Sequence, residues 1–455
     1  MNNRNTSEPA DVPTLSRREF GKQTALAAAA AALAPTVLVA SDNKPAILGG
    51  TPMAKTAWPG WPVVNEAEQS AVRDVVGSGR WYRYAGGASS VDSFESEWAK
   101  TLGVAHCQAT SSGTTSLITA FGALDIGPGD EVLVPPYTFI ATVNSVMLHH
   151  ALPVFVDTDP ATAQIDPSKI AERVNGDTRC VVPVHLGGAS CDMDAVLQIA
   201  RDKKLAVVED SCQTHTGEWK GKRLGGLGDA GCYSFQNSKN ITSGEGGAMV
   251  TPREEIYLRA AAFQNQGSGK RPSDGQFTAN GGNFRLTNFQ GAILREQLKR
   301  LDEQSRHREA NADYLSKLLL EVGGVSAKKK LAGTTRHGYH LYVWEYDPAQ
   351  FAGMDKATFL KALTAEGIPA SGGYGPLNKQ PWVEKMLSSR GFKRIYGDAR
   401  LKRWKDENEL PGNDKMIETC VWLTQNVLLA ERRDMDRIAD SIRRIKSHAS
   451  AIAKA

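Results

Sequence analysis

One lysine lies in a setting where a lysine side chain can act as a nucleophile. Lys239 sits in the polar, glycine-flanked segment 233–247, directly after a short apolar run. A lysine amine held in such a turn can form a Schiff base with a carbonyl compound. Upstream, the buried-strand pattern of residues 205–209 leads straight into Asp210, which places a carboxylate at the carboxyl end of a predicted strand. These two residues are candidates for one site.

A third feature could bind an anion. Residues 110–115 read Thr-Ser-Ser-Gly-Thr-Thr and open a predicted helix, where backbone N–H groups can bind phosphate. A lysine, a strand-end aspartate and a phosphate-binding helix start are the three features that a pyridoxal phosphate enzyme requires. Each feature is common on its own. Their order within one predicted sheet is what favours the joint interpretation.

The elements that must position these side chains alternate between strands and helices. Short apolar runs predict buried strands at residues 132–135, 152–156, 180–185, 205–209, 232–235 and 248–251, and segments of helical period predict helices at 114–124, 139–149 and 193–204. This alternation predicts the α/β class, with a mainly parallel sheet covered by helices on both faces. Sheets of this kind place their sites at the carboxyl ends of the strands.

The pattern changes after about residue 290. A long helix is predicted over residues 289–320 and would bridge two lobes. The three lysines at 328–330 are interpreted as a solvated loop rather than an anion-binding patch. A strand at 340–345, a helix at 356–366 and a terminal amphipathic helix at 432–446 predict a smaller α+β domain. We therefore expect a large domain with an N-terminal arm at residues 41–300 and a small C-terminal domain at 301–455.

The first 40 residues carry the features of an export signal. Two adjacent arginines in segment 16–22 precede an alanine-rich stretch at 24–40, which is typical of a twin-arginine signal. The alternative is a chance arginine pair before an alanine-rich helix. The stretch is too short and too weakly apolar for a stable membrane span. We expect export by the twin-arginine route to the periplasm, or a cytoplasmic location if the signal is not used.

Charge and cysteine content narrow the classes of function. The net charge of +4 is the difference between 54 basic and 50 acidic residues among 455, and no long basic run is present. Nucleic acid is therefore not expected as a partner. The six cysteines show neither a Cys-x-x-Cys pair nor zinc-ligand spacing. We expect no metal site, and disulfides are permitted but not required.

The segment around the lysine resembles a known family. Residues 210–215, 234–239 and 244–247 are similar to the DegT/DnrJ/EryC1/StrS sugar aminotransferases. Supporting matches lie at residues 47–52, 136–142, 185–188, 192–195, 282–286 and 374–377. The resemblance covers nearly everything after residue 45. It implies the fold type I of pyridoxal phosphate-dependent transferases, which is the aspartate aminotransferase type.

The resemblance implies roles for side chains around the cofactor ring. Lys239 matches the lysine that bonds to pyridoxal phosphate and shuttles protons. Asp210 matches the carboxylate on the pyridine nitrogen, and Gln213 matches the side chain near the ring oxygen. Phe139 matches the aromatic residue that stacks on the ring, although a plain core position is the alternative.

The resemblance also implies how the phosphate is held. Gly113, Thr114 and Ser234 match residues that hold the phosphate within one subunit. Asn283 matches a residue that reaches the phosphate from the neighbouring subunit. A site shared in this way requires a homodimer.

Four residues have less certain roles. His185 and His215 could assist proton transfer, but a hydrogen-bonded structural role is an equal alternative for each. Asn378 and Gln266 stand where the family commonly has histidine, in regions associated with substrate recognition. The identity of the acceptor is therefore less defined than the cofactor.

We expect a pyridoxal phosphate-dependent aminotransferase that moves an amino group from glutamate or glutamine to a keto-sugar or keto-cyclitol, with or without a nucleotide attached. Two alternatives remain open: an exported protein that binds the cofactor without turnover, and a pyridoxal phosphate-dependent sugar dehydratase. Relatives of the dehydratase type replace the lysine with histidine, so Lys239 argues against the latter. A nicotinamide enzyme is disfavoured because no predicted strand leads into a Gly-x-Gly-x-x-Gly motif.

Overall fold

The computed structural model describes residues 43–55, 57–268 and 277–454. The predicted export signal at residues 1–40 lies outside this part of the chain. Residues Lys44–Ala455 form one compact unit. No helix among the described residues is long and apolar enough to cross a bilayer.

A seven-stranded sheet carries the predicted site. Its strand order is β1-β11-β10-β7-β6-β2-β3. The strands are β1 (His106–Thr110), β2 (Glu131–Val134), β3 (Leu152–Phe155), β6 (Thr178–Val181), β7 (Ala206–Asp210), β10 (Ala230–Ser234) and β11 (Gly247–Thr251). β11 runs antiparallel to both of its neighbours, β1 and β10, whereas β10, β7, β6, β2 and β3 pair in parallel. The mainly parallel sheet predicted from the sequence is confirmed.

Two strands differ from their predictions for identifiable reasons. The strand predicted at 180–185 ends at Val181, because Pro183 has no N–H to donate to a ladder. Beyond it, the Val182 N–H still donates to the Leu133 carbonyl of β2, and an isolated bridge joins Val184 to Asp210. β1 escaped prediction because its sequence, His-Cys-Gln-Ala-Thr, is not an apolar run, although Gln108 is fully buried.

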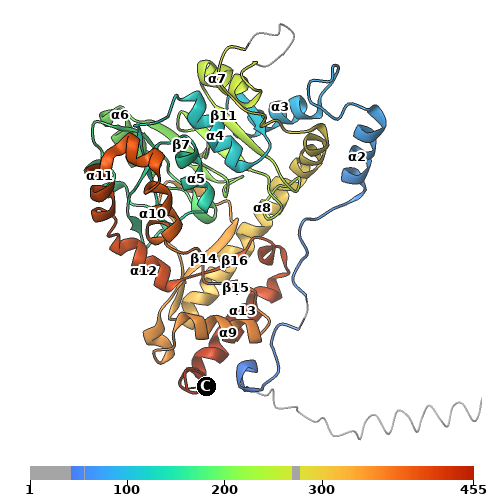
Figure 1. Cartoon of the computed structure of the whole chain (residues 1–455). Coiled ribbons are helices and arrows are strands. Elements are labelled where there is room, and N and C mark those ends of the chain that lie inside the picture. The colour runs from blue at the N-terminus through green and yellow to red at the C-terminus, as the bar shows by residue number, and fades with distance from the viewer. Residues whose placement is uncertain (1–42, 56, 269–276, 455) are drawn as a thin grey trace, which may run out of the picture. The chain divides into compact units, whose positions relative to one another are not determined.

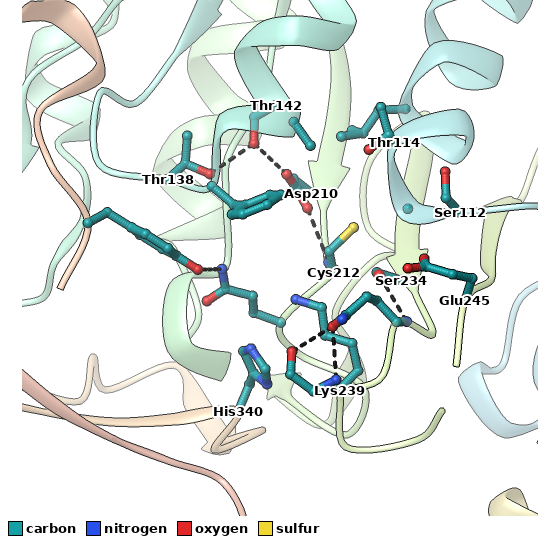
Figure 2. A pocket seen from close by; sticks show the side chains of 18 residues that line it. Ser112, Thr114, Thr138, Thr142, Asp210, Cys212, Ser234, Lys239, Glu245 and His340 are labelled. Carbon is teal, nitrogen blue, oxygen red and sulfur yellow. Dashed lines mark hydrogen bonds between the residues drawn. The ribbon is translucent and has the colours of Figure 1, made fainter. Parts of the chain in front are cut away.

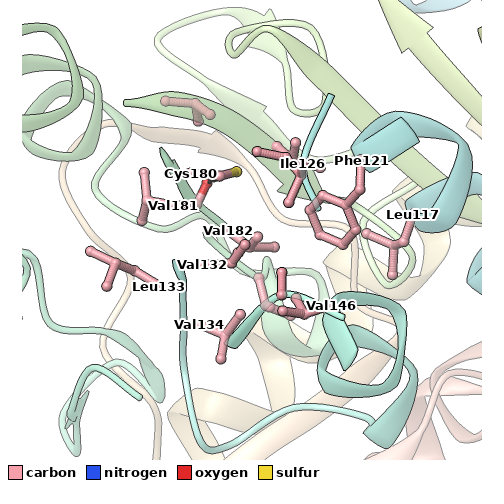
Figure 3. Packing of buried hydrophobic residues seen from close by; sticks show 14 of the residues in the cluster. Leu117, Phe121, Ile126, Val132, Leu133, Val134, Val146, Cys180, Val181 and Val182 are labelled. Atoms are coloured by element: carbon pink, nitrogen blue, oxygen red, sulfur yellow. Dashed lines mark hydrogen bonds between the residues drawn. The ribbon is translucent and has the colours of Figure 1, made fainter. Parts of the chain in front are cut away.

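Helices and apolar side chains cover both faces of this sheet. α4 (Gly113–Ala123), α5 (Ile140–Leu148), α6 (Met193–Lys203) and α7 (Glu254–Gln264) follow strands of the sheet, and α4 packs on β10 and β11. Leu117 and Phe121 of α4 join Val132 of β2 in the cluster shown in Figure 3. A second cluster contains Tyr233 of β10 and Trp98 of α3 (Ser90–Leu102). Cys232 of β10 belongs to the first cluster, so successive residues of β10 enter different clusters, as a sheet buried on both faces requires.

A single long helix belongs to two hydrophobic clusters. α8 (Asn288–Val322) begins with a capping box between Thr287 and Gln290, and α2 (Glu66–Ser78) packs along it. Leu294 joins the cluster beneath the large sheet, whereas Leu315 joins the cluster of the small sheet. Figure 1 shows α8 running from the large sheet toward β14. The predicted division after residue 300 falls inside this helix.

The small sheet is antiparallel, with the order β12-β14-β16-β15. Its strands are β12 (Val325–Ala327), β14 (Leu341–Tyr346), β15 (Ala370–Ser371) and β16 (Cys420–Thr424), and α9 (Lys356–Ala365) and α13 (Arg432–Ser447) pack in its core. The lysine run at 328–330 is not wholly solvated as predicted. The Lys328 side chain is only 7% exposed, because its ammonium donates to the Pro160 carbonyl and pairs with Glu345.

Two helices from the C-terminal third, α10 (Pro381–Leu387) and α11 (Arg390–Asp406), pack on the large sheet instead of the small one. α12 (Pro411–Thr419) instead places Met416 in a cluster with Trp422 of β16. Val383 of α10 and Trp404 of α11 join the cluster around β2 and β3. The Trp404 indole N–H donates to the Pro153 carbonyl at 2.6 Å. Residues 301–455 thus contribute to two cores.

The remaining elements are short. β4 (Thr158–Asp159) pairs with β5 (Gln164–Ile165), and β8 (Glu218–Trp219) pairs with both β9 (Lys222–Arg223) and β13 (Thr334–Arg336). α14 (Ala449–Ile452) follows α13 near the end of the chain.

Candidate active site

The carboxyl ends of β7 and β10 and the start of α4 line one cavity of about 550 Å³. Figure 2 shows the side chains that point into it. All but one of the predicted site residues line this cavity: Gly113, Thr114, Phe139, Asp210, Gln213, Ser234 and Lys239. The exception is Asn283.

The start of α4 forms an anion-binding wall of the cavity. Ser112 caps the helix, because its hydroxyl accepts the Thr115 N–H at 3.1 Å while the Thr115 hydroxyl accepts the Ser112 N–H at 2.8 Å. The N–H groups of Gly113 and Thr114 lie in the first turn, where a helix offers no acceptor. Because the helix dipole also favours negative charge there, this wall suits a phosphate.

Close backbone approach explains two glycines beside this wall. A Cβ on Gly113 would lie 2.6 Å from the Ser234 Cβ, so only glycine lets α4 begin against the end of β10. A Cβ on Gly247 would lie 2.2 Å from the Ser112 carbonyl oxygen. The two glycines therefore allow the strand ends and the helix start to form one continuous wall.

Asp210 is held in a fixed orientation at the end of β7. Its Oδ2 accepts the Thr142 hydroxyl at 2.7 Å, and its Oδ1 accepts the Cys212 N–H at 3.1 Å. The Thr142 hydroxyl also lies 2.9 Å from that of Thr138. Asp210 is 5% exposed, so the cavity is its main opening to solvent. The carboxylate is thus pre-oriented to receive a cationic N–H.

Lys239 extends into the cavity from the loop that follows β10. Its backbone N–H donates to the Gln236 carbonyl at 2.9 Å, which shapes the turn. Burial lowers the pKa of the Lys239 amine, while Cys212 and Asp210 act in the opposite direction. The net lowering favours an uncharged amine, which is the form that acts as nucleophile and base.

Phe139 and Gln213 also line the cavity. Phe139 precedes α5 and is 54% exposed, so its ring offers a flat apolar face and does not act as a core residue. The Gln213 amide donates to the Tyr374 hydroxyl at 3.2 Å and accepts the Gly187 N–H at 2.8 Å. Tyr374 lies 6.1 Å from Phe139 between ring centroids.

The two uncertain histidines lie in the core. The His185 Nε2 lies 3.0 Å from Glu209, and its Nδ1 accepts the Cys191 N–H at 3.2 Å. The His215 Nε2 lies 2.7 Å from the Ser234 carbonyl oxygen, and burial lowers the pKa of His215 to about 3. Neither lines the cavity, so the hydrogen-bonded structural alternative describes both.

The residues that replace the family's histidines, and Asn283, lie away from the cavity. The Asn378 side chain is buried and donates to the Asn408 carbonyl. Gln266 is exposed and accepts a hydrogen bond from Arg285. Asn283 is exposed and bridges to Asn265 through its backbone.

Several residues of the cavity are not among those predicted from the sequence. Thr138 and Thr142 lie in the segment 136–142 that resembles the family, and the predicted helix from 139 could have placed Thr142 beside the strand end. Tyr374 also lies in a segment that resembles the family, at 374–377. His340 begins a predicted strand, yet no local pattern links it to Lys239, which lies about a hundred residues earlier. Only the fold reveals that proximity.

The six cysteines provide neither disulfides nor a thiolate. All six are free, and only Cys212 is more than slightly exposed. Burial raises the pKa of the Cys212 thiol well above its usual value. Among the described residues, no cluster of His, Cys, Asp or Glu could hold a metal ion.

The cavity fits pyridoxal phosphate. It presents a lysine amine, a fixed carboxylate, an aromatic face and a helix start. These groups match the aldehyde, ring nitrogen, ring face and phosphate of that cofactor in chemical type. Asp210 enters the cavity from the end of β7, and Lys239 enters it from the loop after β10.

Comparisons with known proteins agree with this chemistry. Residues 62–394 match the DegT/DnrJ/EryC1/StrS aminotransferase family. The chain is 34% identical to the L-glutamine:2-deoxy-scyllo-inosose aminotransferase of Streptoalloteichus tenebrarius, over 89% of this chain and 97% of that protein. It is also 34% identical to the L-glutamine:scyllo-inosose aminotransferase of Streptomyces griseus, over 91% and 100%. Among solved structures, 3-amino-5-hydroxybenzoic acid synthase superposes with a TM-score of 0.76 at 31% identity, over 88% of this chain and 99% of that chain.

Proposed function

Because the chain belongs to the DegT/DnrJ/EryC1/StrS aminotransferase family and is a pyridoxal phosphate-dependent aminotransferase of fold type I, we propose that it moves an amino group from glutamine or glutamate to a keto-cyclitol or keto-sugar. Two relatives at 34% identity are named for amino transfer from L-glutamine to inososes, which are keto-cyclitols. We therefore place glutamine and a keto-cyclitol first. The observation that carries the proposal is the meeting of Lys239, Asp210 and the α4 start in one cavity.

We infer the roles of the residues from the family resemblance, and their positions in the cavity support these roles. Pyridoxal phosphate, when bound, supplies a carbonyl that binds amines covalently and a ring that withdraws electrons from the substrate carbon. Asp210, oriented by Thr142 and the Cys212 N–H, pairs with the ring nitrogen. Phe139 supports the ring face, and the α4 start with Ser234 holds the phosphate.

Lys239 moves the protons. Its Nζ takes a proton from the α-carbon of the amino donor and, in the second half of the reaction, returns one to the carbon that receives the amino group. The lowered pKa of Lys239 supports this role, since an uncharged amine is needed for the first transfer. Transfer by a positioned base contributes about 10²–10⁴ in rate.

Two alternative functions are less well supported. A sugar dehydratase of this family carries histidine in place of the lysine, whereas this chain has Lys239. A binding protein without turnover would need no uncharged amine beside a fixed carboxylate. Reaction with an amino donor distinguishes these alternatives.

The experiment uses the full chain loaded with pyridoxal phosphate. Borohydride reduction and peptide mass mapping should place the label on Lys239. In a separate sample that has not been reduced, L-glutamine should bleach the visible absorbance, and 2-deoxy-scyllo-inosose or scyllo-inosose should restore it. Lys239→Ala should lose both the absorbance and turnover, while Lys222→Ala, at an exposed lysine in β9, should retain them. A label on another residue, or no bleaching by either amino donor, would refute the proposal.

We further propose a homodimer in which each site receives Asn283 from the partner. Asn283 is exposed and lies outside the cavity of its own chain, which supports a role toward another copy. The Lys239→Ala and Asn283→Ala variants are mixed, unfolded together and refolded. This procedure should produce hybrid dimers in which one of the two sites is intact. Activity above the sum of the two variants is the expected result, and simple additivity would contradict a shared site.

We also propose export by the twin-arginine route, on the basis of the arginine pair in segment 16–22. Replacement of both arginines by lysine should retain the protein in the cytoplasm. Cell fractionation provides the measurement. Equal amounts in the periplasm for the two forms would contradict this route.

A further inference from the structure

A buried histidine that the reaction scheme does not use lies in the cavity beside Lys239. His340 is 5% exposed and directly precedes β14 of the small sheet. It lines the cavity, and Figure 2 shows its ring on the Lys239 side of the site. Its Nδ1 is buried without a hydrogen-bond partner among the described residues. A buried polar atom without a partner is costly, so its retention calls for a functional explanation.

Backbone contacts fix His340 next to the lysine loop. The Asn240 side chain, one residue after Lys239, donates to the Gly338 carbonyl at 2.9 Å and the Tyr339 carbonyl at 3.3 Å. The Gly338 N–H donates to the Gly188 carbonyl at 2.8 Å. A Cβ on Gly188 would lie 2.5 Å from the Tyr339 nitrogen, so glycine is required for this approach. The segment that carries His340 is therefore joined directly to the segment that carries Lys239.

The charged groups around the lysine are distributed unevenly. Asp210 and Cys212 face Lys239 from the end of β7, and Glu245 is an exposed residue of the cavity lining. Near His340 the groups are instead basic: Lys239 itself, His215, and Arg308 of α8. No carboxylate acts on His340 in this set.

Arg308 supplies a fixed positive charge on this side. It is fully buried and donates to the Gln425 side chain at 2.9 Å through its Nε. Within the described part of the chain, it forms no ion pair with a carboxylate. Burial and these basic neighbours hold the pKa of His340 well below its usual value. His340 is therefore a neutral imidazole at neutral pH.

We propose that His340 is a positioning residue for Lys239, whose released ε-amine donates a hydrogen bond to the neutral imidazole and is thereby held in the cavity as an uncharged base. A carboxylate in the same place would also hold the amine, but it would stabilise the ammonium form and remove the base. A neutral acceptor gives the orientation without that penalty. The proposal rests on the proposed function only for the role of the amine, not for the contact.

The direct test measures Lys239 in cofactor-free protein. Acetic anhydride labelling at a series of pH values, quantified by peptide mass mapping, reports the apparent pKa of the Lys239 amine without catalysis. His340→Glu should raise this pKa by about one unit or more, which lowers labelling about tenfold at a pH below the pKa. His340→Gln, which remains neutral, should change it by less than half as much.

His337→Glu is the matched charge control. His337 also precedes β14, but it does not line the cavity, and its Nδ1 accepts the Tyr339 N–H at 2.9 Å. The His337→Glu substitution should leave the labelling of Lys239 near the wild-type value. An unchanged Lys239 pKa in folded His340→Glu, or an equal shift in His337→Glu, would overturn the proposal. Because this readout needs no substrate, it can succeed even if the proposed reaction fails.

A second pair of variants decides the matter if the glutamate variant does not fold. His340→Asn keeps a neutral acceptor, whereas His340→Leu does not. In the cofactor-loaded enzyme, His340→Leu should lower kcat about tenfold below His340→Asn, with similar KM and melting temperature. Equal kcat values in the two variants would overturn the positioning role.

Discussion

Two neighbouring carboxylates at the end of β7 have entirely different surroundings. Glu209 is fully buried and accepts the N–H groups of Gly225, Leu227 and Gly228, each at 2.7 Å, with His185 at 3.0 Å. Asp210 accepts only the Thr142 hydroxyl and the Cys212 N–H, and it lines the cavity.

The difference arises from the geometry of a strand. Successive side chains of a strand point to opposite faces of the sheet, so the consecutive residues Glu209 and Asp210 lie in different environments. The Glu209 carboxylate accepts hydrogen bonds from backbone N–H groups of the loop 225–228. These bonds tie the loop to the sheet. Around Asp210, two donors orient the carboxylate and leave capacity for a ligand. A buried acid is thus structural or functional according to how many of its acceptor sites the protein itself fills.

The largest expected effect concerns Asp210. Asp210→Asn removes the charge that pairs with the ring nitrogen but keeps the shape of the side chain. We expect kcat to fall by about 10²–10³, because a fixed charge aimed at the reacting system is lost. The free energy of unfolding should change little. Steady-state kinetics with urea unfolding checks both, and wild-type kcat would remove Asp210 from the catalytic machinery.

The converse substitution is Glu209→Gln. The amide can accept fewer of the surrounding N–H groups and presents its own N–H to other donors. We expect the free energy of unfolding to fall by about 2–3 kcal/mol, since hydrogen bonds to a charged group are lost. Turnover per folded molecule should stay near the wild-type value. If kcat falls as far as in Asp210→Asn, the assignment of a structural role to Glu209 and a functional role to Asp210 is wrong.

A smaller effect is expected at the residue that orients Asp210. Thr142→Val removes the hydroxyl that donates to Oδ2 while preserving the branched shape. We expect kcat to decrease about tenfold, equivalent to about 1.4 kcal/mol. Ser145→Ala is the control, because that hydroxyl on the same helix bonds to the Ala141 carbonyl instead. Equal losses in both variants would indicate a general effect on α5.

The smallest expected effect is a loss of stability in acid, caused by the buried His215 beside the site. The pKa of His215 is about 3 in the folded chain against 6.5 for an ordinary histidine. Between these values the unfolded chain binds the extra proton, so stability decreases as the pH falls through this window. From pH 6.5 to 5.5 the loss should be about 1 kcal/mol. Urea unfolding of wild type and His215→Gln checks this, and an equal pH slope in both would exclude His215 as the source.

Much of the site could be predicted because its residues stand in local patterns. Asp210 follows an apolar run, Gly113 opens a helix, and Lys239 lies in a distinctive turn, and all three line the cavity. The strand and helix ends were displaced by a residue or two, and Pro183 shortened one strand further. Phe139 was predicted with a core alternative, which its exposure in the cavity excludes.

The remaining features depend on contacts between distant segments. His340 and Tyr374 reach the cavity from the C-terminal half, and no spacing rule connects them to Lys239. Likewise, α10 and α11 carry apolar residues whose partners lie in β2 and β3, so the sequence could not indicate which core they join. The buried lysine in the run at 328–330 shows the same limit, since its partners Pro160 and Glu345 are remote or cross-strand.

The 35-residue length of α8 has a consequence for how the chain can be divided. At 1.5 Å per residue a helix of this length is about 50 Å long, and each half supplies apolar side chains to a different hydrophobic cluster. Truncation anywhere along α8 would remove apolar side chains from one hydrophobic cluster and expose those of the other to water. Neither lobe can therefore be expressed as an autonomous folding unit, and limited proteolysis should release no stable half.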